Sequence, residues 1–286
     1  MEVVLDGALA APFLRVPHVL HYRGNTLDRP TLVFDVLTRF WTATSDHVFC
    51  ISSATAEIFR KRGLAAKVEV LYDPVDVERF ARASRSETVR AELGAGPDDF
   101  LVGTVARIHP RKGIATFLRA GALAMESVPN LRLVIVGCAE AKEEVPYHGE
   151  MLALVSSLGI AERVVWAGAR PDIPQVMKAL DAFVMCSRHE GFGIVVAEAM
   201  AAGLPMVLTE EGAFPELALL GSDMRLADPG IPGGYAEEIL RLAGNVGKGK
   251  AGQRHTISPA EHFGMKTLAS RVAAVYELLL KSREGS

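Results

Sequence analysis

The chain has 286 residues, a formal net charge of −3 and a hydrophobic fraction of 49%, which allows one large or two modest globular domains with a sizeable core. This charge gives no indication of nucleic-acid binding, and no apolar stretch is long enough to cross a bilayer. The three cysteines stand far apart, without disulfide or metal-ligand spacing, which favours a reducing cytoplasm. Charged residues interrupt the weak apolar run at the N-terminus, so we expect no signal peptide.

The first 76 residues read as a short α/β segment. Apolar runs and helical periodicity predict three strands, at residues 16–22, 47–51 and 68–72, and two helices, at 32–42 and 54–62. Ser52 and Ser53 offer an N-cap for the second helix, and Gly63 closes it. Residues 73–76 break the pattern and are expected to be a linker.

Beyond the linker, strands and helices alternate regularly. The apolar runs predict strands at 100–106, 131–137, 164–167, 182–187, 205–209 and 224–227, and helices at 114–126, 149–158, 173–180, 194–202, 215–220 and 234–243. Such alternation predicts a parallel sheet covered on both faces, with ligands bound at the carboxyl ends of the strands. We expect three segments: residues 1–75, residues 76–262, and a C-terminal helical segment, 263–286, that packs back toward the N-terminal part.

Two glutamates flank a glycine-rich turn between a predicted strand and a predicted helix. The turn is Glu190-Gly191-Phe192-Gly193; its glycines let a ligand approach the main chain, and the first helix amides are suited to an anion. Glu198 lies inside the helix among apolar and small residues, where its carboxylate needs hydrogen-bond donors such as sugar hydroxyls. A salt bridge at a packed edge would also explain Glu198, and Glu190 alone would fit an ordinary loop carboxylate.

A basic loop follows the predicted strand at 100–106. It contains Arg107, His109, Arg111 and Lys112 and precedes a predicted helix. Cations are poorly placed at the positive end of a helix unless an anion binds there, and a phosphate would resolve this conflict; a solvated basic loop is the alternative. Since both loops follow strands of one sheet, we expect cations, helix amides and carboxylates to share one rim, as a nucleotide-sugar site requires.

Together these stretches resemble the donor half of the family 4 glycosyltransferases, which have the GT-B fold. That family has a phrase similar to Glu190-Gly191-Phe192-Gly193 followed by the run Glu198 to Pro205, and an arginine and Lys-Gly loop matched by Arg107 and Lys112-Gly113. Its linker motif is matched loosely by residues 73–76 and Phe80. The resemblance runs from about residue 16 to the C-terminus. It implies a GT-B-like α/β chain with a complete C-terminal Rossmann-type donor domain and a partial N-terminal one.

The resemblance also implies an activity: retaining transfer of a hexose-type sugar from a UDP- or GDP-linked donor, without a metal or another cofactor. Arg107 and Lys112 would hold the leaving diphosphate, Glu198 would bind the ribose hydroxyls, and Glu190 would hold a hydroxyl of the transferred sugar. The base usually stacks in the loop that contains Arg170. The other implied donor contacts are Gly191, Phe192, Gly193 and Ile194.

The implied acceptor is a sugar or a lipid-linked molecule. Many relatives act on lipid-linked acceptors, so a peripheral position at the inner face of the membrane stays open beside a cytoplasmic one. This sequence reaches the linker by residue 73, where the family has a full N-terminal domain, so about half of that domain is expected to be absent. A protein partner that supplies the missing half is one explanation. In the family a histidine near the reacting centre follows the strand at 16–22; here Arg23 takes that place, and His21, two residues earlier, is a secondary catalytic candidate against a packed or surface histidine.

Two alternatives to an independent enzyme remain. A donor-binding half-enzyme or inactive homologue that needs a partner chain would retain the donor residues, as this sequence does. An NAD-dependent oxidoreductase would explain the glycine turn and Glu210 and Glu211 after the next strand. Against it, Val196 occupies the third glycine position of the fingerprint, and Glu190 would repel a pyrophosphate.

Overall fold

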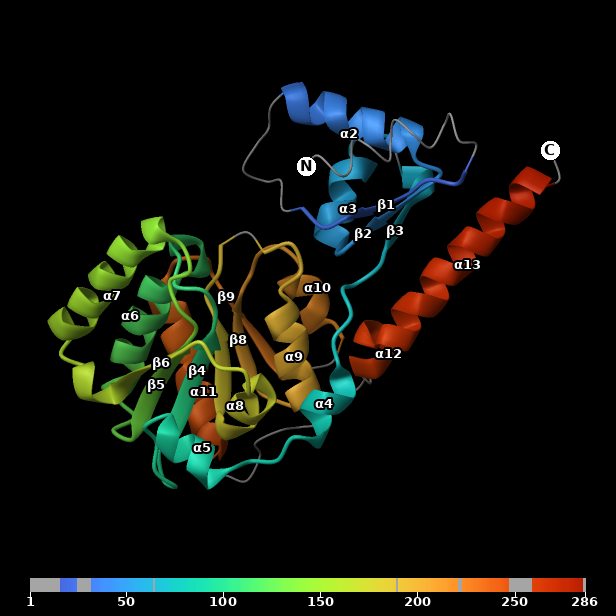
Figure 1. Cartoon of the computed structure of the whole chain (residues 1–286). Coiled ribbons are helices and arrows are strands. Elements are labelled where there is room, and N and C mark those ends of the chain that lie inside the picture. Colours follow the sequence, from blue (N-terminus) through green and yellow to red (C-terminus); the bar gives the residue numbers. More distant parts are fainter. Residues whose placement is uncertain are drawn as a thin grey trace. The chain divides into compact units, whose positions relative to one another are not determined.

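The structure is a computed structural model that describes residues 16–24, 32–63, 65–188, 190–220, 223–246 and 259–284. The chain forms two compact units (Figure 1). The first comprises residues 1–75, 189–194 and 261–286, and the second comprises residues 76–188 and 195–260. The turn at 189–194 therefore belongs to the first unit, although its neighbours in sequence on both sides belong to the second. The N-terminal run for which we expect no signal peptide lies outside the described residues.

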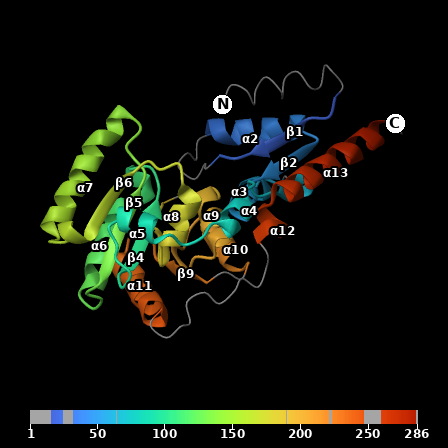
Figure 2. The same ribbon diagram turned by 60° about the horizontal axis from the view of Figure 1, so that its bottom comes forward.

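Three parallel strands form the sheet of the first unit, in the order β1-β2-β3. They span Val19–Tyr22, His47–Cys50 and Val68–Val70. Helices α2 (Leu32–Thr44) and α3 (Ser53–Arg60) contribute Trp41 and Phe59 to the core with Leu20, Tyr22, Val48 and Cys50. Phe49 points to the other face, as the period of a strand requires, and packs with Leu71 and with Val275 of α13 (Met265–Glu284). The C-terminal helix thus runs along this sheet (Figure 2).

Helix α3 begins where its sequence indicates. The Ser52 hydroxyl accepts a hydrogen bond from the Thr55 amide at 3.1 Å, and the Ser52 amide donates to the Thr55 hydroxyl at 3.0 Å. This reciprocal capping satisfies two amides that the helix itself cannot pair. The expected N-cap is confirmed. A 3-10 turn, η1 (Ala65–Lys67), then leads into β3.

Six parallel strands form the sheet of the second unit, in the order β6-β5-β4-β7-β8-β9. The strands are β4 (Phe100–Val105), β5 (Leu131–Val136), β6 (Val164–Gly168), β7 (Ala182–Met185), β8 (Met206–Thr209) and β9 (Met224–Ala227). The helices are α4 (Val77–Arg82), α5 (Glu87–Glu92), α6 (Ile114–Met125), α7 (Val145–Ser157), α8 (Ile173–Ala179), α9 (Ile194–Ala202), α10 (Phe214–Ala218) and α11 (Pro232–Val246), with 3-10 turns η2 (Pro110–Lys112), η3 (Lys142–Glu144) and η4 (Ala161–Arg163); α12 (Pro259–Phe263) follows them.

The strand order reverses between β4 and β7. The chain runs outward from β4 through β5 to β6 and then returns to β7 on the other side of β4. From β4 the chain continues to β5 on one side, and from β7 it continues to β8 on the other. Such a switch point is where open parallel sheets bind their ligands. The predicted basic loop follows β4, and the predicted glutamate turn follows β7.

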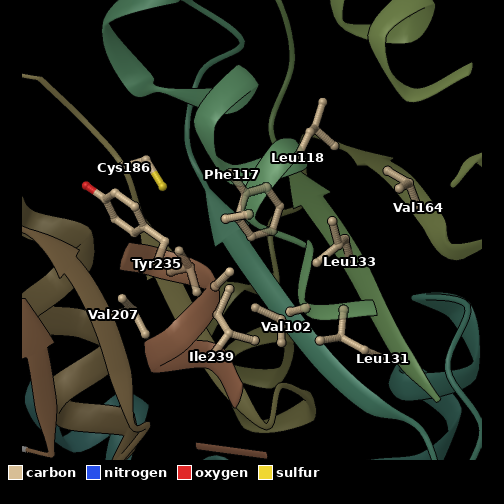
Figure 3. Packing of buried hydrophobic residues seen from close by; sticks show 14 of the residues in the cluster. Val102, Phe117, Leu118, Leu131, Leu133, Val164, Cys186, Val207, Tyr235 and Ile239 are labelled. Atoms are coloured by element: carbon tan, nitrogen blue, oxygen red, sulfur yellow. The ribbon is translucent and has the colours of Figure 1, made fainter. Parts of the chain in front are cut away.

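The core beside the sheet joins residues from distant parts of the sequence (Figure 3). Val102 and Leu133 of the sheet pack with Phe117 of α6, and Tyr235 and Ile239 of α11 complete the cluster. All five are at most 1% exposed. Burial of one such aliphatic or aromatic side chain stabilises a fold by roughly 1.5–3 kcal/mol, so the loops rest on a well-packed base.

Two differences from the sequence predictions have local causes. The helix predicted at 149–158 begins at Val145, because Pro146 lies in its first turn, where a missing amide costs nothing. The unpredicted helices α4 and α5 have 6 residues each, too few to show a helical period; Asp76 and Ser86 cap them. In the described part of the chain, no helix combines the length and the apolar character needed to cross a membrane.

Candidate functional site

The chain leaving β4 and the chain leaving β7 are joined backbone to backbone. The Arg188 amide donates a hydrogen bond to the Arg111 carbonyl at 2.9 Å. Gly113 has a left-handed φ of 67° and lies so close to Cys186 that a Cβ would overlap its carbonyl oxygen and lie 2.7 Å from its carbonyl carbon. Only glycine fits this junction. The chain after β4 and the chain after β7 thus meet at one sheet edge, through Arg111 with Arg188 and Gly113 with Cys186. That Glu190 and Glu198 share this edge with the cations stays a prediction.

The basic loop itself is anchored at both ends. The Ile108 amide donates to the Cys138 carbonyl at 3.0 Å, and the Ile108 side chain is buried. His109 caps η2, because its Nδ1 accepts from the Arg111 amide at 3.1 Å. Lys112 is half-buried just before α6. The fold thus holds the cations of this loop at the start of a helix, where an anion would be favoured.

Arg107 projects from the same loop toward two carboxylates. Its Nη1 lies 3.3 Å from Glu144 Oε1 and 3.9 Å from Glu140 Oε2. Glu144 is almost fully buried, whereas the Arg107 side chain is 52% exposed. Backbone hydrogen bonds from Ala141 and Glu140 lower the pKa of Glu144, so its carboxylate is ionised at neutral pH.

Glu198 lies on α9 and is half-buried. Burial raises the pKa of its carboxyl group, and the positive charge of Arg79 on α4 opposes this increase. No ion pair to Glu198 forms within the described residues, so the salt bridge considered from the sequence is not observed there. A carboxylate in this setting gains from hydrogen-bond donors that a ligand brings.

We predict that Glu198→Gln makes the ligand-free protein more stable. Because the folded-state pKa of Glu198 lies above its ordinary value, its charge destabilises the fold at every pH above that ordinary value. The amide should therefore raise Tm at pH 7.5 by about 1–3 °C. Scanning calorimetry checks this, and at pH 4 the difference should shrink, since the carboxyl is then largely protonated. An equal gain at both pH values would contradict the assigned cause.

The glycine turn is held by an aromatic cluster of the first unit. Phe192 is 2% exposed and stacks on Tyr72, with ring centroids 5.3 Å apart and 19° between the planes. Phe263 of α12 packs against both rings. Gly193, with φ 82°, leads from this cluster into α9, whose first residue, Ile194, is exposed. The Phe192 side chain is therefore an anchor of the turn and is not exposed for ligand contacts. Glu190 is half-buried in the same turn.

Arg170 follows β6 and is held by two acids. Its guanidinium pairs with Asp172 at 2.6 Å and with Glu92 of α5 at 2.9 Å. The hydrogen bonds that Arg170 donates to these carboxylates raise its pKa, and the Arg170 side chain is only 19% exposed. The structure thus fixes the loop in which the resemblance places the nucleotide base. A contact from Arg170 to a donor stays a prediction.

His21 and Arg23 lie in the first unit. His21 is half-buried on β1, where its ring meets Phe49 edge to face at 6.1 Å. Burial lowers its pKa, and the nearby Asp73 carboxylate opposes this effect. Arg23 lies beyond the end of β1 and pairs with Asp73 at 2.8 Å. His21 is neither fully packed nor on the surface, and its part in catalysis stays a prediction.

A cavity of about 630 Å³ opens at the opposite edge of the large sheet. Phe100 and Asp181, which border it, stand at the amino ends of β4 and β7. It therefore lies away from the two loops described above. Among the described residues, no group of three or more His, Cys, Asp or Glu side chains is arranged to hold a metal ion.

Sequence reasoning missed the partners of the site residues. Glu144, Asp172 and Tyr72 each hold a predicted site residue in place, yet none was singled out. Asp172 stands two residues from Arg170, and this spacing was a usable signal. Glu144 and Tyr72 are far in sequence from the residues they contact, so no local pattern indicates their pairing.

Comparison with known families shows that this α/β chain belongs to the glycosyltransferase class. The sequence model described as "Glycosyl transferases group 1" matches residues 85–248, and that of "Glycosyltransferase Family 4" matches residues 3–79. The chain therefore belongs to the group 1 glycosyl transferases, and the family indicated by the glutamate phrase is confirmed.

Named relatives and solved structures agree with this assignment. The lipopolysaccharide core biosynthesis mannosyltransferase LpsB of Rhizobium meliloti is 28% identical over 253 residues, which cover 85% of this chain and 69% of that protein. A D-inositol 3-phosphate glycosyltransferase of Segniliparus rotundus is 31% identical over 75% of this chain and 48% of its own length. The chain thus spans about half of that relative and of several similar ones.

The solved structure of Anabaena Alr3699/HepE in complex with UDP and glucose has a TM-score of 0.80 and 26% sequence identity, over 96% of this chain and 75% of that chain. The α/β, GT-B fold class expected from the sequence is confirmed by this likeness. The N-terminal part of the chain is short relative to such neighbours.

Proposed function

We propose that this chain transfers a sugar from a nucleoside diphosphate donor to a hydroxyl group of an acceptor. The observation that supports this most directly is the junction of Gly113 with Cys186, which holds the loop of Arg107 and Lys112 at the switch point of the large sheet. Membership of the glycosyl transferases group 1 family points to the same class of reaction.

In the proposed reaction, the acceptor oxygen replaces the diphosphate at the anomeric carbon. The bond from that carbon to the diphosphate oxygen breaks, the diphosphate leaves with the electron pair, and the proton of the acceptor hydroxyl passes to the departing diphosphate. We assign stabilisation of the leaving charge to Arg107 and Lys112, whose positions are set before the ligand arrives. Glu198 would accept hydrogen bonds from the ribose hydroxyls, and Glu190 from a hydroxyl of the transferred sugar.

Retention of the anomeric configuration, independence from metals and the donor base are further parts of the proposal. UDP is the first donor to test, because the Anabaena protein is described in complex with UDP-glucose and an Escherichia coli relative is named a UDP-Gal-dependent galactosyltransferase. The named relatives differ in their acceptors, so the proposal extends only to a hydroxyl group of a sugar or polyol, free or lipid-linked.

We predict that Lys112→Ala weakens UDP binding about tenfold or more, because a hydrogen bond between charged partners contributes about 1.5–3 kcal/mol. Uridine, which lacks the diphosphate, should bind the variant and the wild type equally. Isothermal titration calorimetry with UDP, GDP and uridine measures both effects. Lys266→Ala, which removes the same charge from an exposed position on α13, is the control.

Several outcomes would contradict this assignment. Equal losses for UDP and uridine would place Lys112 away from the diphosphate, and a wild-type protein that binds neither UDP nor GDP would overturn the function. A marked loss of UDP affinity in EDTA would contradict metal independence. UDP binding without release of UDP from UDP-sugars would instead favour the donor-binding half-enzyme.

A further inference from the structure

Glu144 divides its two carboxylate oxygens between different partners. Oε2 accepts hydrogen bonds from the backbone amides of Glu140 at 2.7 Å and Ala141 at 3.1 Å. Oε1 accepts from Arg107 Nη1 at 3.3 Å. The Glu144 side chain is only 3% exposed, so the two amides hold a buried, oriented carboxylate beneath an exposed guanidinium.

The contacts of Arg107 with acids use one side of its guanidinium. Both carboxylates, Glu144 and Glu140, are approached by Nη1. A guanidinium carries five N–H donors in a rigid fork, so Nε and Nη2 form a second edge. No residue in the described ranges pairs with this second edge. Its two parallel N–H groups have the geometry that binds a phosphate in a bidentate manner.

We propose that Glu144 is a positioning residue for donor binding: it holds Arg107 by Nη1 so that the Nε–Nη2 edge faces the diphosphate of the nucleotide sugar. This inference rests on the proposed function, in which Arg107 contacts the diphosphate. Glu144 itself touches no part of the donor. Its contribution is to order a long, exposed side chain before binding, so that less conformational freedom is lost when the ligand arrives.

A carboxylate beside a phosphate site also has an opposing effect. Its negative charge repels the diphosphate, and removal of that charge alone would strengthen UDP binding. At Glu144 this repulsion is reduced, because two backbone amides and Arg107 already compensate the charge. Glu140 approaches the same guanidinium from 3.9 Å with a side chain that is 62% exposed. It therefore provides a carboxylate of equal charge with a weaker hold on Arg107.

The test is a double-mutant cycle of Glu144→Gln and Arg107→Ala, with UDP and uridine as probes in isothermal titration calorimetry. Glutamine has one acceptor oxygen and cannot serve both the amides and Arg107. We expect Glu144→Gln to weaken UDP binding about fivefold in the wild-type background and not at all in the Arg107→Ala background, as for two residues that act as one unit. Uridine binding should stay unchanged. Glu140→Gln, the matched control, should not weaken UDP binding.

Each other outcome overturns the inference. A similar loss for uridine would mean that Glu144 only maintains the loop, and an equal loss in the Arg107→Ala background would mean that it does not act through Arg107. Tighter UDP binding by Glu144→Gln would mean that the Glu144 carboxylate competes with the diphosphate for Arg107. If Glu144→Gln does not fold, Glu144→Asp, which keeps both oxygens but shortens the reach, takes its place in the same cycle. Failure of the wild type to bind UDP or GDP refutes the proposed function instead.

Discussion

Replacement of Gly113 by alanine is expected to reduce UDP affinity more than tenfold and to lower Tm. The residue has a φ of 67°, and its Cβ would overlap the Cys186 carbonyl. A left-handed conformation costs a non-glycine residue about 1–3 kcal/mol, and the overlap with backbone forces a shift of the junction itself. Because Arg107 and Lys112 belong to the loop that Gly113 closes, the cations would move as well. Calorimetric titration with UDP and thermal unfolding measure the two effects.

Gly159 provides a matched control for Gly113. It has the same φ of 67°, but a Cβ added there would meet nothing within 4 Å. Gly159→Ala should therefore show the conformational cost alone, with UDP affinity unchanged. If Gly113→Ala lowers Tm no more than Gly159→Ala and keeps its UDP affinity, the close contact with Cys186 does not hold the site.

Arg90→Met is expected to destabilise the protein by about 3–5 kcal/mol, the usual effect of removing one partner from a buried ion pair. Arg90 is fully buried and donates to the carbonyls of Gly96 (3.0 Å) and Ala179 (2.8 Å), to the Asp99 carbonyl, and to the Asp181 carboxylate at 2.9 Å. Without the guanidinium these acceptors lose their donors. A decrease in Tm of about 10 °C should follow, and urea unfolding gives the free energy directly.

Arg82→Met is the control, because Arg82 pairs with Glu78 on the surface, where both side chains are more than 70% exposed. Such pairs contribute about 0–1 kcal/mol. If Arg90→Met lowers the free energy of unfolding by less than about 1 kcal/mol, other groups replace the hydrogen bonds of the Arg90 guanidinium, and the prediction is wrong. Asp99 and Asp181 directly precede β4 and β7, so Arg90 ties together the amino ends of the two central strands.

The large sheet was predictable because each of its strands is a short apolar run followed by a helical period. Leu131–Val136, for example, consists of five aliphatic residues and one arginine, as a strand buried on both faces requires. The order of the strands was not predictable in the same way. The reversal between β4 and β7 depends on which distant strands pair, and no local period carries that information.

The candidate site was predictable to the same extent. Arg107, Lys112 and Glu198 stand out because charged residues occur beside buried strands or inside an apolar helix, where each needs an explanation. Their surroundings could not be foreseen. Arg107 and Glu144 are separated by 37 positions, and the acids that hold Arg170 lie on a short helix and in a turn that show no period. The role of the Phe192 ring in the glycine turn was equally ambiguous from the sequence. In the structure this ring stacks on Tyr72, a partner that no local pattern indicates.

The three thiols allow the two units to be followed separately as they unfold. Cys50 is buried in the sheet of the first unit, and burial raises its pKa to about 12. Cys186 is buried in the second unit, and burial raises its pKa as well. Since only the thiolate reacts readily, alkylation at either position must wait for its own unit to open. With the partly exposed Cys138 replaced by serine, the two labelling rates would report the opening of each unit within one polypeptide.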